Sequence, residues 1–174
     1  QDADPEYNEL PPLVLDADAL NLLAKIDDWP NLVPANTVIA PHPGEMARLC
    51  EVATSDVQAN RVGLAREKAA AWNVIVLLKG AHTVVAAPDG RITVLPFKTD
   101  ALATAGTGDV LAGVIVSLLG QGVAPFNAAV AGAYLHGSAG QVAATTHGTP
   151  TSVIASDVLN TLSEVLGRLL PSRS

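Results

Sequence analysis

The sequence predicts a three-layer α/β fold, in which helices cover both faces of a mostly parallel central sheet. Short apolar segments of strand length alternate along the chain with longer segments that have helical spacing, as in strand–helix–strand units. Apolar residues make up 49% of the 174 residues but aromatic residues only 3%, so the core must consist of Ala, Val, Leu and Ile. Such residues suit parallel strands, which are buried on both faces.

The strands are expected in the short apolar runs of the sequence. The parallel strands are expected at residues 13–15, 37–40 and 74–78. A β-hairpin is expected from residues 83–87 and 92–95, because the sequence Pro-Asp-Gly between them is a turn signal.

The helices follow the strands. They are expected at residues 19–27, 44–50, 55–72, 110–120 and 125–145. The third is amphipathic, with Ser55 as a candidate cap and with Val62, Ala65, Ala69 and Trp72 on one face. A last amphipathic helix uses Ile154, Val158, Leu162, Val165 and Leu169.

The length suits one domain, residues 1–174, with a substantial core. The expected sheet is small for the number of helices, so we expect a domain whose N-terminal part is missing from this chain.

The net charge of −7 argues against a nucleic-acid partner, although a single anionic metabolite can still bind through backbone donors. Polar residues interrupt the apolar stretch 110–135, which therefore predicts two buried helices and no membrane span. The acidic, polar start of the chain and the single cysteine, Cys50, predict a cytoplasmic protein without a signal peptide or disulfide.

The stretch "AGTGDVLAG" is the strongest candidate for a site. Ala105, Gly106, Thr107 and Gly108 can point successive backbone amides at one place, and the following helix adds its positive end. This arrangement predicts an anion hole for a phosphate. Asp109 could then accept a proton from a substrate hydroxyl. The alternative is an ordinary glycine turn in which Thr107 or Asp109 caps the helix.

Polar side chains also follow the expected parallel strands. In "VLDADALN", Asp16 and Asp18 come just after the first strand, and either could instead cap the next helix. In "APHPGE", His42 and Glu45 follow the second strand. A carboxylate at Glu45 can hold a hydrated Mg²⁺, or can simply favour the helix N-terminus. Ligands bind outside the carboxyl ends of such strands, so these groups could meet the Asp109 loop.

The strongest strand ends in "LLKGAHTVV". Lys79 could lie beside a polyphosphate and Gly80 could allow its close approach, or the segment could be a plain connection to the hairpin. His82 is expected at the turn surface. His136, in "YLHGSAG", is expected to be a hydrogen-bonded core residue.

The order and the spacing of these five motifs along the chain resemble those of a known enzyme family. That family is the ADP/ATP-dependent NAD(P)H-hydrate dehydratases of the ribokinase-like superfamily. The resemblance covers nearly all of this chain but only the later part of the family's catalytic domain. It implies a ribokinase-like α/β fold with Mg²⁺ and a nucleotide co-substrate, ADP in most bacterial members and ATP in eukaryotic ones. It also implies that hydrated NADH and NADPH (NADHX and NADPHX) are phosphorylated on the ring hydroxyl and lose phosphate.

The resemblance also implies residue roles. Asp109 would be the base, and His42 and Asp109 would contact the hydrate. Glu45 and Asp16 would lie near the metal, through water, by superfamily analogy. The nucleotide would contact Lys79, Gly80, Ala81, His82, Thr83 and Gly108. Family habit and the Ala- and Gly-rich helices further predict a homo-oligomer. Two other functions remain open: a ribokinase-like kinase of a vitamin precursor or sugar, and an inactive nucleotide-binding fragment.

Overall fold

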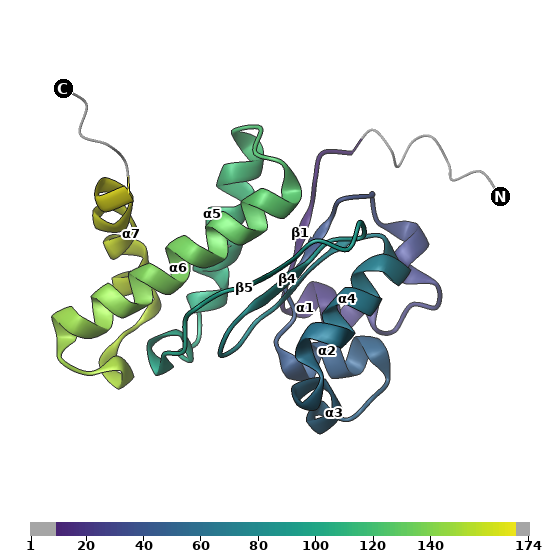
Figure 1. Cartoon of the computed structure of the whole chain (residues 1–174), viewed down its shortest axis with the longest axis horizontal. Helices are drawn as coiled ribbons and strands as arrows, with labels where there is room; N and C mark the ends of the chain where they lie inside the picture. The colour runs from purple at the N-terminus through teal and green to yellow at the C-terminus, as the bar shows by residue number, and fades with distance from the viewer. Residues whose placement is uncertain (1–9, 170–174) are drawn as a thin grey trace.

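The computed structural model describes residues 10–169, and strands and helices alternate along them as predicted (Figure 1). The strands are β1 (Val14–Leu15), β2 (Val38–Ile39), β3 (Ile75–Leu78), β4 (Val84–Ala86) and β5 (Ile92–Val94). The α-helices are α1 (Asp18–Leu23), α2 (Pro43–Cys50), α3 (Thr54–Ala59), α4 (Arg61–Trp72), α5 (Thr107–Gly120), α6 (Pro125–His147) and α7 (Ala155–Leu169). Short 3₁₀ helices are η2 (Trp29–Leu32), η3 (Asp100–Leu102) and η4 (Pro150–Ser152).

The five strands form one sheet in the order β1-β2-β3-β4-β5. The first three are parallel: Val38 of β2 pairs with Val14 on one side and with Ile75 on the other. The last two return as an antiparallel hairpin, with Val84 between Leu78 and Val94. Three parallel strands and one hairpin were expected, and all are confirmed.

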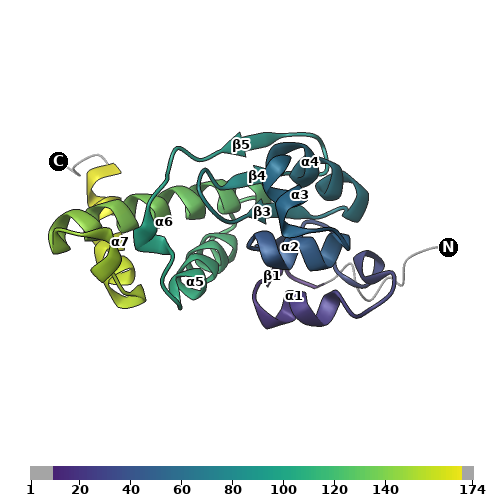
Figure 2. The same ribbon diagram turned by 90° about the horizontal axis from the view of Figure 1, so that it is seen from below.

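Helices cover both faces of this sheet (Figure 2). Alternate residues of β3 point to opposite sides, because successive side chains in a strand do so. Ile75 and Leu77 pack with residues of α5 and α6, whereas Val76 and Leu78 pack with residues of α1 to α4. All four side chains are buried, which explains why this strand is continuously apolar. The predicted three-layer architecture is confirmed.

The helix expected over residues 55–72 is wrong in detail. It is two helices, α3 and α4, separated by Asn60, whose φ of −139° and ψ of 49° are not helical. Asparagine favours helix ends because its side chain competes for backbone hydrogen bonds. Ser55 is no cap, since α3 begins one residue earlier and has no side-chain cap. Val62 is exposed, because α4 turns Ala65 and Ala69 toward the core instead.

Three further boundaries differ from expectation. Helix α1 ends at Leu23 rather than near residue 27, and neither Asp16 nor Asp18 caps it: the N-cap position is Ala17, without a side-chain hydrogen bond. Helix α7 starts after Ile154, which is exposed, whereas Val158 and Val165 are buried as expected. Leu169 is exposed as well.

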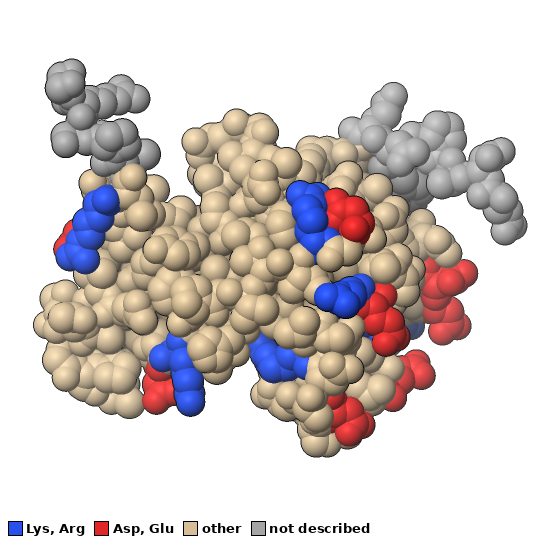
Figure 3. Space-filling model, in the orientation of Figure 1, with Lys and Arg blue, Asp and Glu red and all other residues tan. Residues whose placement is uncertain are grey.

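Helix α6 runs past the sheet and carries α7 on its distal half (Figure 1). A third cluster of apolar side chains fills this junction, including Leu135, Ala139, Val153, Val158 and Val165. On the face seen in Figure 3, charged side chains gather over α2 to α4, whereas the broad area over α5 and α6 has few. Within residues 10–169, no helix combines the length and the apolar character that crossing a membrane requires.

Candidate functional site

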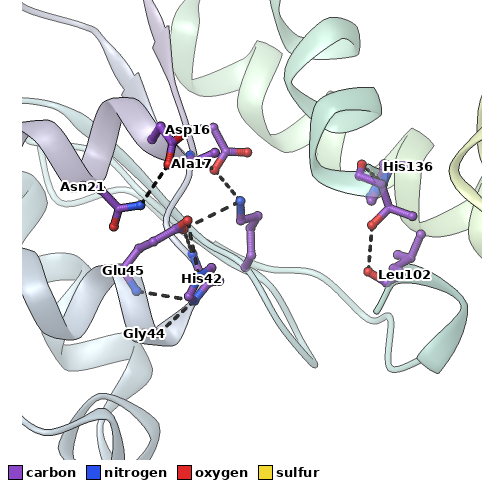
Figure 4. A network of polar contacts seen from close by, with 11 residues as sticks. Asp16, Ala17, Asn21, His42, Gly44, Glu45, Leu102 and His136 are labelled. Atoms are coloured by element: carbon purple, nitrogen blue, oxygen red, sulfur yellow. Dashed lines mark hydrogen bonds and ion pairs between the residues drawn. The ribbon is translucent and has the colours of Figure 1, made fainter. Parts of the chain in front are cut away.

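The carboxyl ends of the three parallel strands bring an ion-pair cluster together (Figure 4). Asp16 follows β1, Glu45 lies in the helix that follows β2, and Lys79 follows β3. The ammonium of Lys79 is paired with Asp16 Oδ1 and lies 3.9 Å from Glu45 Oε2. One cation therefore stands between two mostly buried carboxylates. Parallel strands produce this convergence because their carboxyl ends share one edge of the sheet.

His42 and Glu45 hold each other at the start of α2. His42 is the N-cap residue, and its Nδ1 accepts hydrogen bonds from the amides of Gly44 and Glu45 at 3.0 and 3.3 Å. Glu45 Oε2 accepts from the His42 amide at 2.7 Å, and Oε1 lies 3.3 Å from His42 Nε2. This reciprocal pair is a capping box built on histidine. It leaves the His42 ring half-exposed and fixed in orientation, with both oxygens of Glu45 engaged.

The turn before α5 is pinned by Thr107. Gly106 has a φ of +86° and occupies the N-cap position without a side-chain cap, so neither Thr107 nor Asp109 caps the helix. Instead, the Thr107 hydroxyl donates to the carbonyls of Leu102 and Thr104 at 2.9 and 2.8 Å, and its amide donates to Thr104. The next two amides, of Gly108 and Asp109, have no acceptor among the described residues.

Helix α5 begins directly against the ion-pair cluster. A Cβ atom on Gly108 would lie 3.4 Å from Asp16 Oδ2 and 3.6 Å from Lys79 Nζ. Two free amides, the positive end of a helix and a lysine thus meet at one point, which suits a phosphate. Asp109 is the next residue, is exposed, and makes no side-chain hydrogen bond with any described residue. Its carboxylate is free to accept a proton.

A pocket of about 290 Å³ opens beside this point. Its polar end includes Lys79, Gly80, Thr83 and Gly108. Its other walls come from residues 95–103 and from α5 and α6, and include Leu95, Phe97, Leu102, Leu111, Ala133 and His136. A pocket that combines polar groups with apolar side chains can hold the phosphates and the base of a nucleotide.

Two glycines of α6 let residues 95–103 approach closely enough to form this wall. A Cβ on Gly137 would lie 2.2 Å from the ring of Phe97, and one on Gly140 would lie 2.6 Å from Leu102. The glycines of "HGSAG" are therefore required by the packing of the pocket wall.

Comparison with known proteins identifies the family. The family model described as NAD(P)H-hydrate dehydratase matches residues 5–164. The chain belongs to this family. A bifunctional NAD(P)H-hydrate repair enzyme of Moorella thermoacetica is 46% identical over 91% of this chain and 30% of its own length. An ADP-dependent (S)-NAD(P)H-hydrate dehydratase of Neisseria meningitidis is 45% identical over 84% of this chain and 50% of its own length.

The dehydratase fold is also shared. The crystal structure of an ADP/ATP-dependent NAD(P)H-hydrate dehydratase from Bacillus subtilis, co-crystallised with ATP and Mg²⁺ and soaked with CoA, superposes with a TM-score of 0.81 at 33% identity. The match covers 91% of this chain and 57% of that one. The expected ribokinase-like fold is confirmed. The chain spans half or less of the length of the curated dehydratase relatives named above.

Most of the residues that were expected to bind the nucleotide line this pocket. Lys79, Gly80, Ala81, Thr83 and Gly108 all line it. His82 does not line the pocket. Its Nδ1 lies 3.3 Å from the Leu95 carbonyl oxygen, and its φ is +54°. Of the expected anion-hole residues, Thr107 and Gly108 line the pocket, whereas Ala105 and Gly106 form the turn before it.

Two residues of the site were not found from the sequence. Arg61 donates from its guanidinium to the carbonyls of Leu78 and Lys79 at 3.1 and 3.2 Å, and partial burial lowers its pKa from the usual value. Nothing in the sequence distinguishes it from a surface arginine of a helix. His136 was expected to be a bonded core residue, and it is buried and bonded to the Thr107 carbonyl at 2.8 Å. Its place on the pocket wall was missed.

Proposed function

We propose that this chain carries the ADP- or ATP-dependent dehydratase site that returns NADHX and NADPHX to NADH and NADPH. Membership of the NAD(P)H-hydrate dehydratase family supports the reaction. The observation that carries it on this chain is the junction of Gly108, Asp16 and Lys79, because Gly108 and Lys79 also line the pocket. Asp109 follows Gly108 directly and makes no side-chain hydrogen bond with any described residue, which supports a general base beside a phosphate.

In the proposed mechanism, the nucleotide lies in the pocket with its terminal phosphate at the α5 N-terminus. Asp109 takes the proton of the ring hydroxyl as that oxygen attacks the terminal phosphorus. The bond between the terminal phosphorus and the bridging oxygen of the nucleotide breaks, and the shortened nucleotide leaves: ADP yields AMP and ATP yields ADP. The phosphorylated hydrate then expels inorganic phosphate and loses a ring proton, which restores the double bond. Phosphorylation helps because phosphate is a far better leaving group than hydroxide.

The other groups have binding roles in this proposal. The amides of Gly108 and Asp109 and the ammonium of Lys79 hold the transferred phosphoryl group, because each directs positive charge at it. His42, fixed by the capping box at the neighbouring strand end, contacts the hydrate.

Mg²⁺ would accompany the nucleotide, where it neutralises charge on the phosphates. The residues fit it unequally. Asp16 Oδ2 faces Gly108 and has no partner among the described residues, so it can reach a hydrated ion. Both oxygens of Glu45 are occupied by His42, so Glu45 would act through water at most. No group of three or more His, Cys, Asp or Glu side chains within residues 10–169 could hold a metal by itself.

The direct test uses freshly made hydrated NADPH with Mg²⁺ and either ADP or ATP, and follows the return of reduced-nicotinamide absorbance. We expect nucleotide-dependent recovery, and a loss of at least about 100-fold in Asp109→Asn, the usual contribution of a general base. Asp89→Asn is the matched control, since Asp89 pairs with Arg91 in the exposed hairpin turn. A stable phosphorylated product would indicate a kinase, and binding without turnover a nucleotide-binding module. Either would contradict the proposal.

We also propose a homo-oligomer in the cytoplasm. Cytoplasmic residence is supported by the reaction, since its substrates arise from cofactors of metabolism. The single cysteine, Cys50, has no partner for a disulfide within this sequence, which fits this location. The face over α5 and α6, which shows few charged side chains, supports self-association (Figure 3).

A further inference from the structure

His136 joins α6 to the first residue of α5, and the mechanism above gives it no role (Figure 4). Its Nε2 lies 2.8 Å from the carbonyl oxygen of Thr107, and the side chain is buried on the pocket wall. A carbonyl oxygen can only accept a hydrogen bond. Nε2 must therefore carry the proton and donate it, which settles the tautomer of the ring.

The bonded carbonyl belongs to the same peptide unit as the Gly108 amide. A peptide unit is planar and trans, so its C=O and N–H point in opposite directions. A side chain that holds the Thr107 oxygen therefore also sets the direction of the Gly108 N–H. That N–H is one of the two free amides at the start of α5 and lies at the Asp16–Lys79 junction.

The other anchors of this turn act on a different peptide unit. The Thr107 hydroxyl and amide bond to the carbonyls of Leu102 and Thr104, which hold the residue in place from its N-terminal side. Among the described residues, only His136 provides a side-chain donor to the Thr107 carbonyl. Along the helix, this carbonyl takes the regular bond from the amide four residues on, that of Leu111, but it lies in the terminal turn, where helix ends fray.

We propose that His136 is a positioning residue, which fixes the Thr107–Gly108 peptide plane so that the Gly108 N–H points at the phosphate of the bound nucleotide. The proposal rests on the proposed function. His136 does not itself touch the reacting atoms in this role. Its hydrogen bond also polarises the peptide and strengthens the Gly108 donor, since hydrogen bonds in a chain reinforce one another.

The test compares two substitutions of His136. In His136→Gln the side-chain amide nitrogen can take the place of Nε2 and donate to Thr107, whereas His136→Leu has no donor. ADP binding with Mg²⁺ is measured by calorimetry, together with the KM and kcat of the dehydration. We expect about tenfold weaker binding and a higher nucleotide KM in His136→Leu, as one lost hydrogen bond allows, and near-wild-type values in His136→Gln. His147→Leu is the matched control, a histidine of the same helix at its exposed end.

Unchanged ADP affinity in His136→Leu would overturn the proposal. So would equal losses in both variants, because ring packing and not the hydrogen bond would then matter. If the wild-type chain binds no ADP, the proposed function fails, and the amide ¹⁵N resonance of Gly108 decides the positioning role without ligand. A shift in His136→Leu that returns in His136→Gln supports it, and an unmoved resonance contradicts it.

Discussion

At the scale of single residues, buried His136 makes the stability of the protein depend on pH. Burial lowers its pKa from 6.5 to about 4, and the nearby Lys79 charge adds to this. Between pH 6.5 and 4 the His136 imidazole is protonated in the unfolded chain but stays neutral in the native protein. The unfolding free energy therefore falls as the pH falls. We expect a loss of about 3 kcal/mol from this group between pH 7 and pH 4. Urea unfolding of wild type and His136→Gln at several pH values measures it, and parallel curves for the two proteins would contradict it.

At the scale of elements, α6 shapes the pocket through close packing. Gly137 meets the ring of Phe97, whereas Gly113 in α5 has open space around its Cβ position. We expect Gly137→Ala to lower the unfolding free energy by about 1–3 kcal/mol, the cost of overpacking, and to weaken ADP binding because Phe97 lines the pocket. Gly113→Ala is the control, and should be neutral or stabilising by up to about 1 kcal/mol, since alanine favours helices. Thermal unfolding and calorimetry test both. Equal effects of the two substitutions would argue against this account of the pocket wall.

At the scale of the whole molecule, the sheet holds the site and α6 carries α7 beyond it (Figure 1). Several large apolar side chains remain exposed, among them Val116 in α5 at 52% and Leu159 in α7 at 55%. Together with the face over α5 and α6, which shows few charged side chains, these predict self-association, because exposed apolar patches usually mark contact surfaces. Light scattering at micromolar concentration should give a mass of at least twice 17.8 kDa. A monomeric mass across the concentration range would contradict the expected homo-oligomer.

The sequence by itself determined the elements whose signals are local. The apolar run of β3, the Pro-Asp-Gly turn of the hairpin and the glycine turn before α5 depend on neighbouring residues, so their places were predicted correctly. The order of strand-end polar groups also predicted which residues would share one edge of the sheet. Two errors were local as well: Asn60 divides a stretch that was expected to form one helix, and Ala17 occupies the N-cap position for which Asp16 and Asp18 were candidates.

Only the tertiary structure decided how the site is assembled. The ion pair of Lys79 with Asp16 joins residues 63 positions apart, and the bond of His136 to Thr107 joins residues 29 positions apart. Arg61, in α4, donates a hydrogen bond to the carbonyl of Leu78 at the end of β3. Glycine is required at position 137 only because the ring of Phe97 packs against it. Such contacts depend on how the layers pack and on which face of a helix meets the sheet. Spacing along one chain does not contain that information, because the same local pattern can be packed in many ways.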